Sequence, residues 1–204
     1  MMSDMTWIET FNQTLFLRVN ATGEAPAWLF KLAVFFADEL IYVIPALLII
    51  MWLRGGSTRR GLAIKSCLIT LLALGLNQGI GLIWQHPRPA MINLGHTWIA
   101  SAADSSFPSD HMTVFTAVGL TLLLGRATRS GAAILASGIL VAWARVYLGV
   151  HFPLDMVGAV IVVAATYLVV AALWSAYGEG LTKSAERLFR ILFAGLIASG
   201  WIRN

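Results

Sequence analysis

Residues 144–155 read ARVYLGVHFPLD and lie between two long apolar stretches of the chain. The segment contains three charged or titratable side chains, Arg145, His151 and Asp155. Such side chains are costly near a bilayer core, so their presence between apolar stretches points to a functional site. If a helix begins after Phe152, Asp155 can accept one imidazole N–H and leave the other ring nitrogen free as a base or nucleophile. For this stretch alone, an ordinary salt bridge at a helix junction is the alternative.

The composition is that of an integral membrane protein. Of the 204 residues, 58% are apolar and only 12% are charged, which excludes an ordinary soluble domain. We attribute the net charge of +4 to basic residues that set the orientation of the chain in the membrane, and not to nucleic-acid binding. The single cysteine, Cys67, excludes a disulfide framework and is expected to be buried in an apolar helix. No removable signal peptide is expected at the N-terminus.

The apolar pattern predicts a single all-α membrane domain over residues 1–204, with a bundle of about five to six transmembrane helices. Five candidate spans cover residues 27–53, 62–84, 109–125, 131–149 and 154–174. Residues 1–26 are expected to form an amphipathic helix on the membrane surface. Residues 176–204 are expected to form a cytoplasmic amphipathic tail, in which 181–202 lies on the surface or makes a short sixth span.

Two smaller features within the spans carry structural expectations. Asp38 and Glu39 interrupt the first span, and we expect them to have a structural or gating role. Gly75, Gly79 and Gly81 of the second span are expected to allow close approach of a neighbouring helix.

Two further polar motifs join the first one at the same membrane face. HPRP (residues 86–89) ends the second span, and FPSDH (107–111) begins the third. Because successive spans alternate in direction, these motifs and the segment around His151 should meet at one end of the bundle. Arginine and serine side chains beside the free backbone N–H groups of a helix start would make an anion cradle that suits phosphate.

A metal site is the main alternative for the same residues. His86, His111, His151 and Asp155 are residue types that bind zinc. Two arginines beside them would repel a cation, however, and no helix carries a paired-ligand motif of the HExxH kind. A phosphate site is therefore favoured over a metal site.

The three motifs resemble the signature motifs of the type 2 phosphatidic acid phosphatase superfamily. Within it, the chain is most similar to the bacitracin-resistance type of bacterial undecaprenyl-diphosphate phosphatase, over about residues 27–175. The resemblance implies an enzyme of the bacterial plasma membrane that hydrolyses a polyprenyl diphosphate without a metal or other cofactor. A phosphatidylglycerophosphate, phosphatidic acid or lipid A phosphatase of the same superfamily is the alternative.

The resemblance also implies a role for each matching residue. His151 would be the nucleophile and form a phosphohistidine, Asp155 would orient it, and His111 would protonate the leaving oxygen and then activate water. Arg88, Arg145, Ser109 and the backbone at Asp110 would hold the phosphoryl oxygens.

The chain departs from the general family pattern at Gly81, where many members have a phosphate-binding lysine. The bacitracin-resistance type also tends to lack this lysine. Asn77, Gln85 or His86 could supply a compensating donor.

The basic residues predict which way the bundle is inserted. Only Arg18, Lys31, Arg88 and Arg145 are expected at the motif end, whereas the opposite end has Arg54, Arg59, Arg60, Arg126, Arg129, Lys183, Arg187, Arg190 and Arg203. The positive-inside rule makes the second end cytoplasmic, so the site is expected to open to the periplasmic side, together with the N-terminus.

Overall fold

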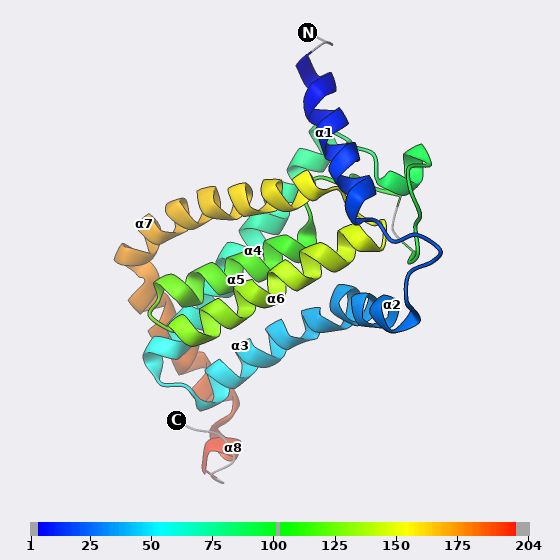
Figure 1. Cartoon of the computed structure of the whole chain (residues 1–204). Coiled ribbons are helices and arrows are strands. Elements are labelled where there is room, and N and C mark those ends of the chain that lie inside the picture. Colours follow the sequence, from blue (N-terminus) through cyan, green and yellow to red (C-terminus); the bar gives the residue numbers. More distant parts are fainter. Residues whose placement is uncertain (1–3, 101–102, 199–204) are drawn as a thin grey trace.

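The computed structural model describes residues 4–100 and 103–198, which fold into helices and connecting loops with no strand. The predicted all-α class is therefore confirmed (Figure 1). The α-helices are α1 (Asp4–Val19), α2 (Ala27–Val34), α3 (Val43–Arg54), α4 (Ser57–Ile83), α5 (Asp110–Leu124), α6 (Thr128–Tyr147), α7 (Pro153–Leu192) and α8 (Ala194–Ala198). A π-helical turn, Phe35–Glu39, and a 3-10 turn, Leu40–Tyr42, join α2 to α3, and a second 3-10 turn covers Pro89–Ile92.

Four helical segments are long and apolar enough to cross a membrane: Ala27–Arg54, Ser57–Ile83, Thr128–Tyr147 and Pro153–Leu192. They correspond to four of the five predicted spans. The remaining span is α5, an apolar helix of only 15 residues. At 1.5 Å per residue α5 is about 22 Å long, shorter than the roughly 30 Å of a bilayer's hydrocarbon core.

Helix α5 lies at the centre of the bundle and is packed by α4, α6 and α7 (Figure 1). Phe115, Val118 and Leu122 of α5 are fully buried in the main apolar cluster. Helix α6 can approach α5 closely because Gly131 has no side chain. An added Cβ atom there would lie only 2.4 Å from the backbone nitrogen of Leu123.

The expectation for the glycines of the second span was wrong at two positions. Added Cβ atoms at Gly75 and Gly79 would meet nothing within 4 Å, so these glycines do not allow close helix packing. Gly81 does face a neighbour, but the neighbour is Ser105 of a loop. Cys67 is exposed on α4 and not buried as expected.

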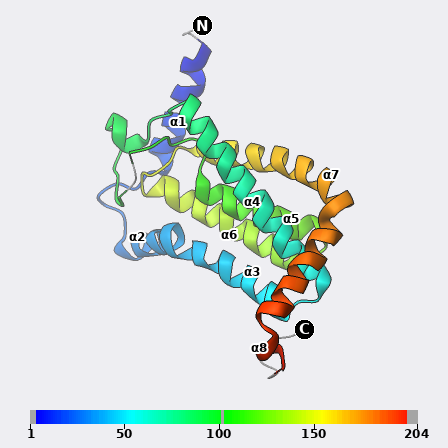
Figure 2. The ribbon, with the colours of Figure 1, turned by 180° about the vertical axis from the view of Figure 1, so that it is seen from behind.

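Helix α7 corrects the predicted C-terminal boundary. It continues through residues 176–192 as one helix of 40 residues, where a separate tail helix over 181–202 was expected. Its C-terminal part lies beside the end of α3 and the start of α4 (Figure 2). There the rings of Trp52 of α3 and Phe189 of α7 meet edge to face at 5.6 Å between centroids. The remainder of the expected tail, including Arg203, lies outside the described residues.

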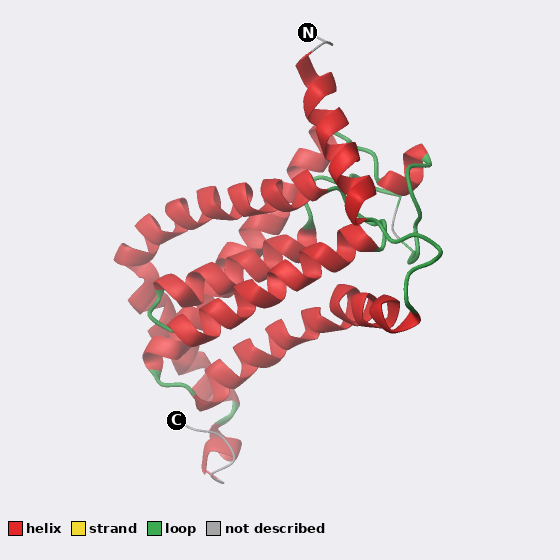
Figure 3. Ribbon diagram, viewed as in Figure 1, coloured by secondary structure: helices red, strands yellow, loops and turns green. Residues whose placement is uncertain are grey.

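Helix α1 runs across one end of the bundle and not along it (Figures 1 and 2). The side chain of Asn12 accepts a hydrogen bond of 3.0 Å from the backbone N–H of Leu154, in the first turn of α7. Phe16 is fully buried against Phe152, with ring centroids 5.3 Å apart. The long connections gather at this same end, as Figure 3 shows. The three polar motifs lie in these connections and in the helix turns next to them.

Candidate active site

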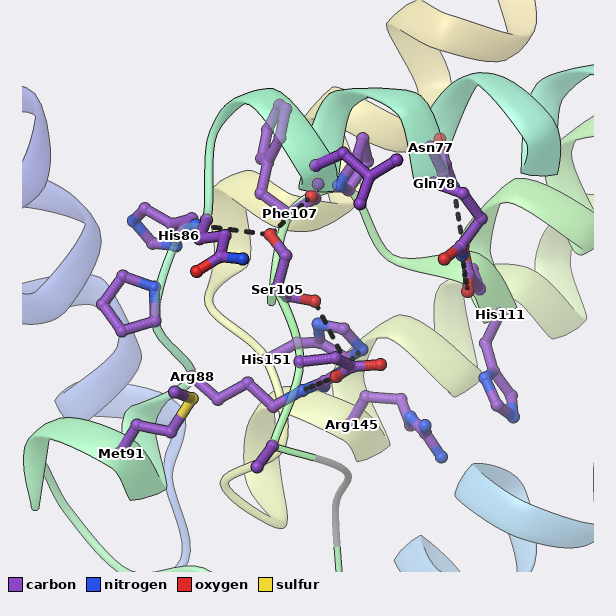
Figure 4. A pocket seen from close by; sticks show the side chains of 18 residues that line it. Asn77, Gln78, His86, Arg88, Met91, Ser105, Phe107, His111, Arg145 and His151 are labelled. Carbon is purple, nitrogen blue, oxygen red and sulfur yellow. Dashed lines mark hydrogen bonds and ion pairs between the residues drawn. The ribbon is translucent and has the colours of Figure 1, made fainter.

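The three polar motifs line one cavity of about 540 Å³ at the α1 end of the bundle (Figure 4). Arg88 comes from the HPRP segment, His111 from the first turn of α5, Arg145 from the last turn of α6 and His151 from the loop before α7. The predicted convergence of the motifs is therefore confirmed.

His151 and Asp155 form the buried centre of this site. Nδ1 of His151 lies 3.1 Å from Oδ2 of Asp155, and the two side chains are 3% and 0% exposed. The same Oδ2 accepts a 2.8 Å hydrogen bond from the backbone N–H of Phe152, which is the N-cap residue of α7. Asp155 thus caps the helix and holds the imidazole with one oxygen atom.

The hydrogen bonds determine the tautomer of His151. Nη1 of Arg88 lies 3.2 Å from Nε2 of His151, and a guanidinium group can only donate. Nε2 must therefore be the unprotonated nitrogen, and Nδ1 carries the hydrogen toward Asp155. Its Nε2 lone pair is available for attack once Arg88 shifts.

Burial also favours a neutral His151. Removal from water lowers the pKa of this imidazole, although the hydrogen bond and the charge of Asp155 raise it. Nearby Arg88 and Arg145 lower the pKa further. A neutral imidazole is the nucleophilic form.

Ser106 is a site residue that the sequence analysis missed. Its hydroxyl is fully buried and donates a 2.5 Å hydrogen bond to Oδ2 of Asp155, and it lies 3.3 Å from Nδ1 of His151. Ser106 therefore provides a third hydrogen bond to the oxygen that orients the histidine. Nothing in the sequence around Ser106 distinguishes it from Ser105.

Each arginine of the cavity has a carboxylate partner. Nη2 of Arg88 lies 2.8 Å from Oδ1 of Asp104, whose side chain is 63% exposed at the cavity mouth. Nη1 of Arg145 lies 3.3 Å from Oδ1 of Asp38, in the π-helical turn. Asp38 does not itself line the cavity, but it contacts Arg145, which does. This ion pair is a specific contact for the structural role expected of Asp38.

The start of α5 contributes His111, Asp110 and Ser109 in different ways. His111 is half-buried and lines the cavity. Asp110 also lines it and accepts hydrogen bonds from the side chains of Asn77, at 2.8 Å, and Gln78, at 3.2 Å. The structure does not bring the Ser109 side chain to the cavity, because it is fully buried as the N-cap of α5.

Gly81 lines the cavity beside the loop that carries Ser105. A Cβ atom at Gly81 would lie 3.2 Å from Cβ of Ser105, so a side chain there would require this loop to move by a few tenths of an ångström. Asn77 is one expected substitute, but its amide already donates to Asp110 and Thr113. Gln85 lines the cavity and is exposed, which leaves it as the best placed of the expected donors.

His86 belongs to the scaffold of the site and not to its centre. Its Nε2 lies 3.1 Å from Oε2 of Glu9 on α1, and its ring packs against Trp84 and Phe152. Over residues 4–100 and 103–198, no three His, Cys, Asp or Glu side chains are grouped closely enough to hold a metal ion. The four residues considered for zinc are thus not assembled as a ligand set.

Comparison with known proteins agrees with this geometry. Residues 62–179 match the model of the PAP2 superfamily. YbjG of Escherichia coli (strain K12), whose name assigns it provisionally as an undecaprenyl-diphosphatase, is 36% identical over 97% of this chain and 100% of its own length. The undecaprenyl-diphosphatase BcrC of Bacillus subtilis (strain 168) is 27% identical over 88% of this chain and 91% of its own.

A solved structure shares the fold. The crystal structure of Aquifex aeolicus LpxE superposes with a TM-score of 0.64 at 22% identity, covering 79% of this chain and 95% of that one. The family match over more than half of the chain, together with the full-length relative, leads to one conclusion: the chain is a multi-pass membrane protein that belongs to the PAP2 superfamily.

Proposed function

We propose that this protein is a membrane undecaprenyl-diphosphate phosphatase that acts through a phosphohistidine. The observation that carries the proposal is the His151 imidazole, held neutral with Nε2 directed at a cavity that two arginines line. Two full-length or nearly full-length relatives carry the name undecaprenyl-diphosphatase. No such support favours a phosphatidic acid, phosphatidylglycerophosphate or lipid A phosphatase.

In the first step, Nε2 of His151 attacks the terminal phosphorus atom of the diphosphate. A bond forms between nitrogen and phosphorus, and the bond from that phosphorus to the bridging oxygen breaks. Undecaprenyl phosphate leaves, and His111 gives it a proton. The hydrogen on Nδ1 of His151 stays between the ring and Asp155, which offsets the positive charge that develops on the imidazole.

In the second step, a water molecule attacks the phosphohistidine. His111 takes the proton from this water, the nitrogen–phosphorus bond breaks, and inorganic phosphate is released. Neutral His151 is restored with the same tautomer.

The phosphoryl oxygens would be held by Arg88, Arg145 and the backbone N–H groups near Asp110. Arg88 and Arg145 are planar donors suited to a phosphate, and α5 begins at the cavity with free N–H groups. Ser109 contributes by capping α5 and so fixing the position of those groups. To bind the substrate, the two arginines exchange Asp104 and Asp38 for phosphate oxygens.

We propose that the site opens on the periplasmic side of the bacterial plasma membrane. The turns at the opposite end, α3–α4 and α5–α6, carry Arg54, Arg59, Arg126 and Arg129, which favours a cytoplasmic location for that end. At the outer face the enzyme would regenerate the carrier lipid of cell-wall synthesis. By removing undecaprenyl diphosphate, it would contribute to bacitracin resistance.

The decisive test is phosphate release by the purified protein in detergent with EDTA present. Undecaprenyl diphosphate and phosphatidic acid are offered separately, and His151→Ala is measured in parallel. The proposal is supported if the wild type releases phosphate from the diphosphate and His151→Ala does not. Activity only without EDTA would indicate a metal mechanism, and activity chiefly on phosphatidic acid would move the protein to the alternative substrate class.

The role of His111 has its own test. Undecaprenyl phosphate is a better leaving group than the alkoxide released from a lipid monophosphate, so proton donation matters less for the diphosphate. We expect His111→Ala to keep more residual activity on the diphosphate than on a monophosphate lipid. Equal losses on the two substrates would contradict this division of roles.

A further inference from the structure

A second cavity, of about 430 Å³, lies at the end of the bundle opposite the candidate active site. Helices α5 and α6 both reach the active site at their other ends, so the turn that joins them belongs to this opposite end. The cavity is formed by that turn, the last turns of α3 and the first turn of α4.

Four arginines from separate elements line this cavity. Arg54 ends α3, Arg59 is in the first turn of α4, Arg126 is in the α5–α6 turn, and Arg129 is in the first turn of α6. The other lining residues are Leu47, Ile50, Met51, Ala127, Thr128 and Ser130, so no acidic side chain offsets the four charges.

The four guanidinium groups have no carboxylate partner elsewhere in the part of the chain that the structure describes. The ion pairs at this end join Arg60 to Glu186 and Lys183 to Glu179, and they leave the cavity arginines unpaired. Four like charges around one cavity repel one another, and an anion in the cavity would offset part of that repulsion.

The start of α6 adds hydrogen-bond donors to the same cavity. Its N-cap, Ala127, offers no side-chain cap, so the backbone N–H groups of the first turn are free to meet an anion. Arg126, next to it, adopts a left-handed conformation with φ of 65°, which is uncommon for a residue other than glycine. The turn therefore holds an arginine in a costly conformation beside free donors.

The apolar side of the cavity indicates the source of the anion. Leu47 and Ile50 of α3 line it, and Ile50 is 54% exposed on the outer surface of a membrane-spanning segment. A ligand here would meet arginines at one end and the lipid-facing surface of α3 at the other. We propose that this cavity binds the phosphate headgroup of an anionic phospholipid whose acyl chains lie along α3.

Membrane topology alone would also place arginines at this end. It accounts well for Arg187 and Arg190 of α7, which are exposed like the four cavity arginines but do not line the cavity. It does not account for the convergence of four arginines on one cavity. These two α7 arginines therefore provide a control in which the same charge is removed from the same end.

The experiment measures thermal unfolding of the full chain in a neutral detergent as short-chain phosphatidylglycerol is added. Phosphatidylcholine of the same chain length is the uncharged reference. We compare the wild type with Arg126→Gln/Arg129→Gln and with the control Arg187→Gln/Arg190→Gln. Because each variant is measured against its own value in phosphatidylcholine, a change in intrinsic stability does not obscure the result.

Phosphatidylglycerol should stabilise the wild type and the control alike. In Arg126→Gln/Arg129→Gln the concentration for half of this effect should rise at least roughly tenfold, since hydrogen bonds to a charged group are lost. If this variant does not fold, Arg54→Gln/Arg59→Gln tests the other wall of the cavity in the same way. Equal losses in the cavity and control variants would overturn the proposal, because they would show attraction to charge in general.

Inorganic phosphate in place of the lipid separates the two sources of the anion. Binding at the active site would be common to all variants, so only the difference between the cavity and control variants counts. No such difference is expected with inorganic phosphate. If inorganic phosphate reproduces the difference, the cavity is a site for free anions and the lipid assignment is wrong.

Discussion

Replacing Asp155 by asparagine tests whether its charge drives attack by His151. Oδ2 of Asp155 lies 3.1 Å from Nδ1 of His151, and the imidazole becomes positive as Nε2 bonds to phosphorus. At an effective dielectric constant of about 20, a full unit charge at this distance is stabilised by about 5 kcal/mol. With about half of the charge developed in the transition state, the loss is about 3 kcal/mol, or roughly a hundredfold in kcat.

The assay is steady-state phosphate release from undecaprenyl diphosphate. KM should stay within about threefold, because Asp155 is fully buried and does not line the cavity. Asp104→Asn is the matched control, since Asp104 is exposed and contacts Arg88 but not His151. The reasoning is refuted if Asp155→Asn retains kcat within about threefold while it unfolds at the wild-type temperature, because the charge would then not act on the transition state.

Three other predictions concern the same loops. Ser106→Ala should lower the free energy of unfolding by about 1.5–3 kcal/mol, since the buried Asp155 loses one hydrogen bond, and unchanged thermal unfolding would contradict this. Gly149→Ala should lower the free energy of unfolding by more than about 1 kcal/mol, because φ at Gly149 is 82° and an added Cβ atom would lie 2.1 Å from the backbone oxygen of His96. Unfolding at the wild-type temperature would contradict this, since it would show that the loop adapts to the side chain. The lowered pKa of His151 keeps the imidazole unprotonated in mildly acidic solution. The midpoint of the acid limb in the pH profile of kcat/KM should therefore lie below pH ~6.5, and a midpoint above that value would contradict the prediction.

The sequence was sufficient to predict the convergence of the three motifs. Alternating spans bring the ends of α4 and α6 and the starts of α5 and α7 to one face, whatever the detailed packing. The contact between His151 and Asp155 was also predictable, because residues four apart meet at the start of a helix. Both predictions depend on local geometry or on chain direction alone.

Contacts between distant segments could not be predicted in this way. Ser106 and Asp155 are 49 residues apart, and no period or motif pairs them. The partner of Arg145 is 107 residues away, at Asp38, and the π-helical turn that presents it has no sequence signature that we recognised. Such contacts follow from how the helices pack against one another.

The C-terminal boundary was misplaced for a different reason. The charged residues and the glycines at positions 178 and 180 resemble the end of a span, and the apolar pattern weakens there. The helix nevertheless continues to Leu192, and this part packs beside the start of α4, where Arg60 lies 3.7 Å from Glu186. Tertiary packing thus overrode the local pattern.

The shortness of α5 has a consequence for how the enzyme meets its substrate. Because α5 is about 8 Å shorter than the hydrocarbon core, the cavity at its N-terminal end is recessed below the membrane surface, where a lipid can reach it from within the bilayer. A polyprenyl diphosphate can then arrive by lateral diffusion within its own leaflet, with its tail never leaving the membrane. Turnover should follow the mole fraction of substrate in the bilayer, so that adding inert lipid at constant total substrate slows the reaction by surface dilution.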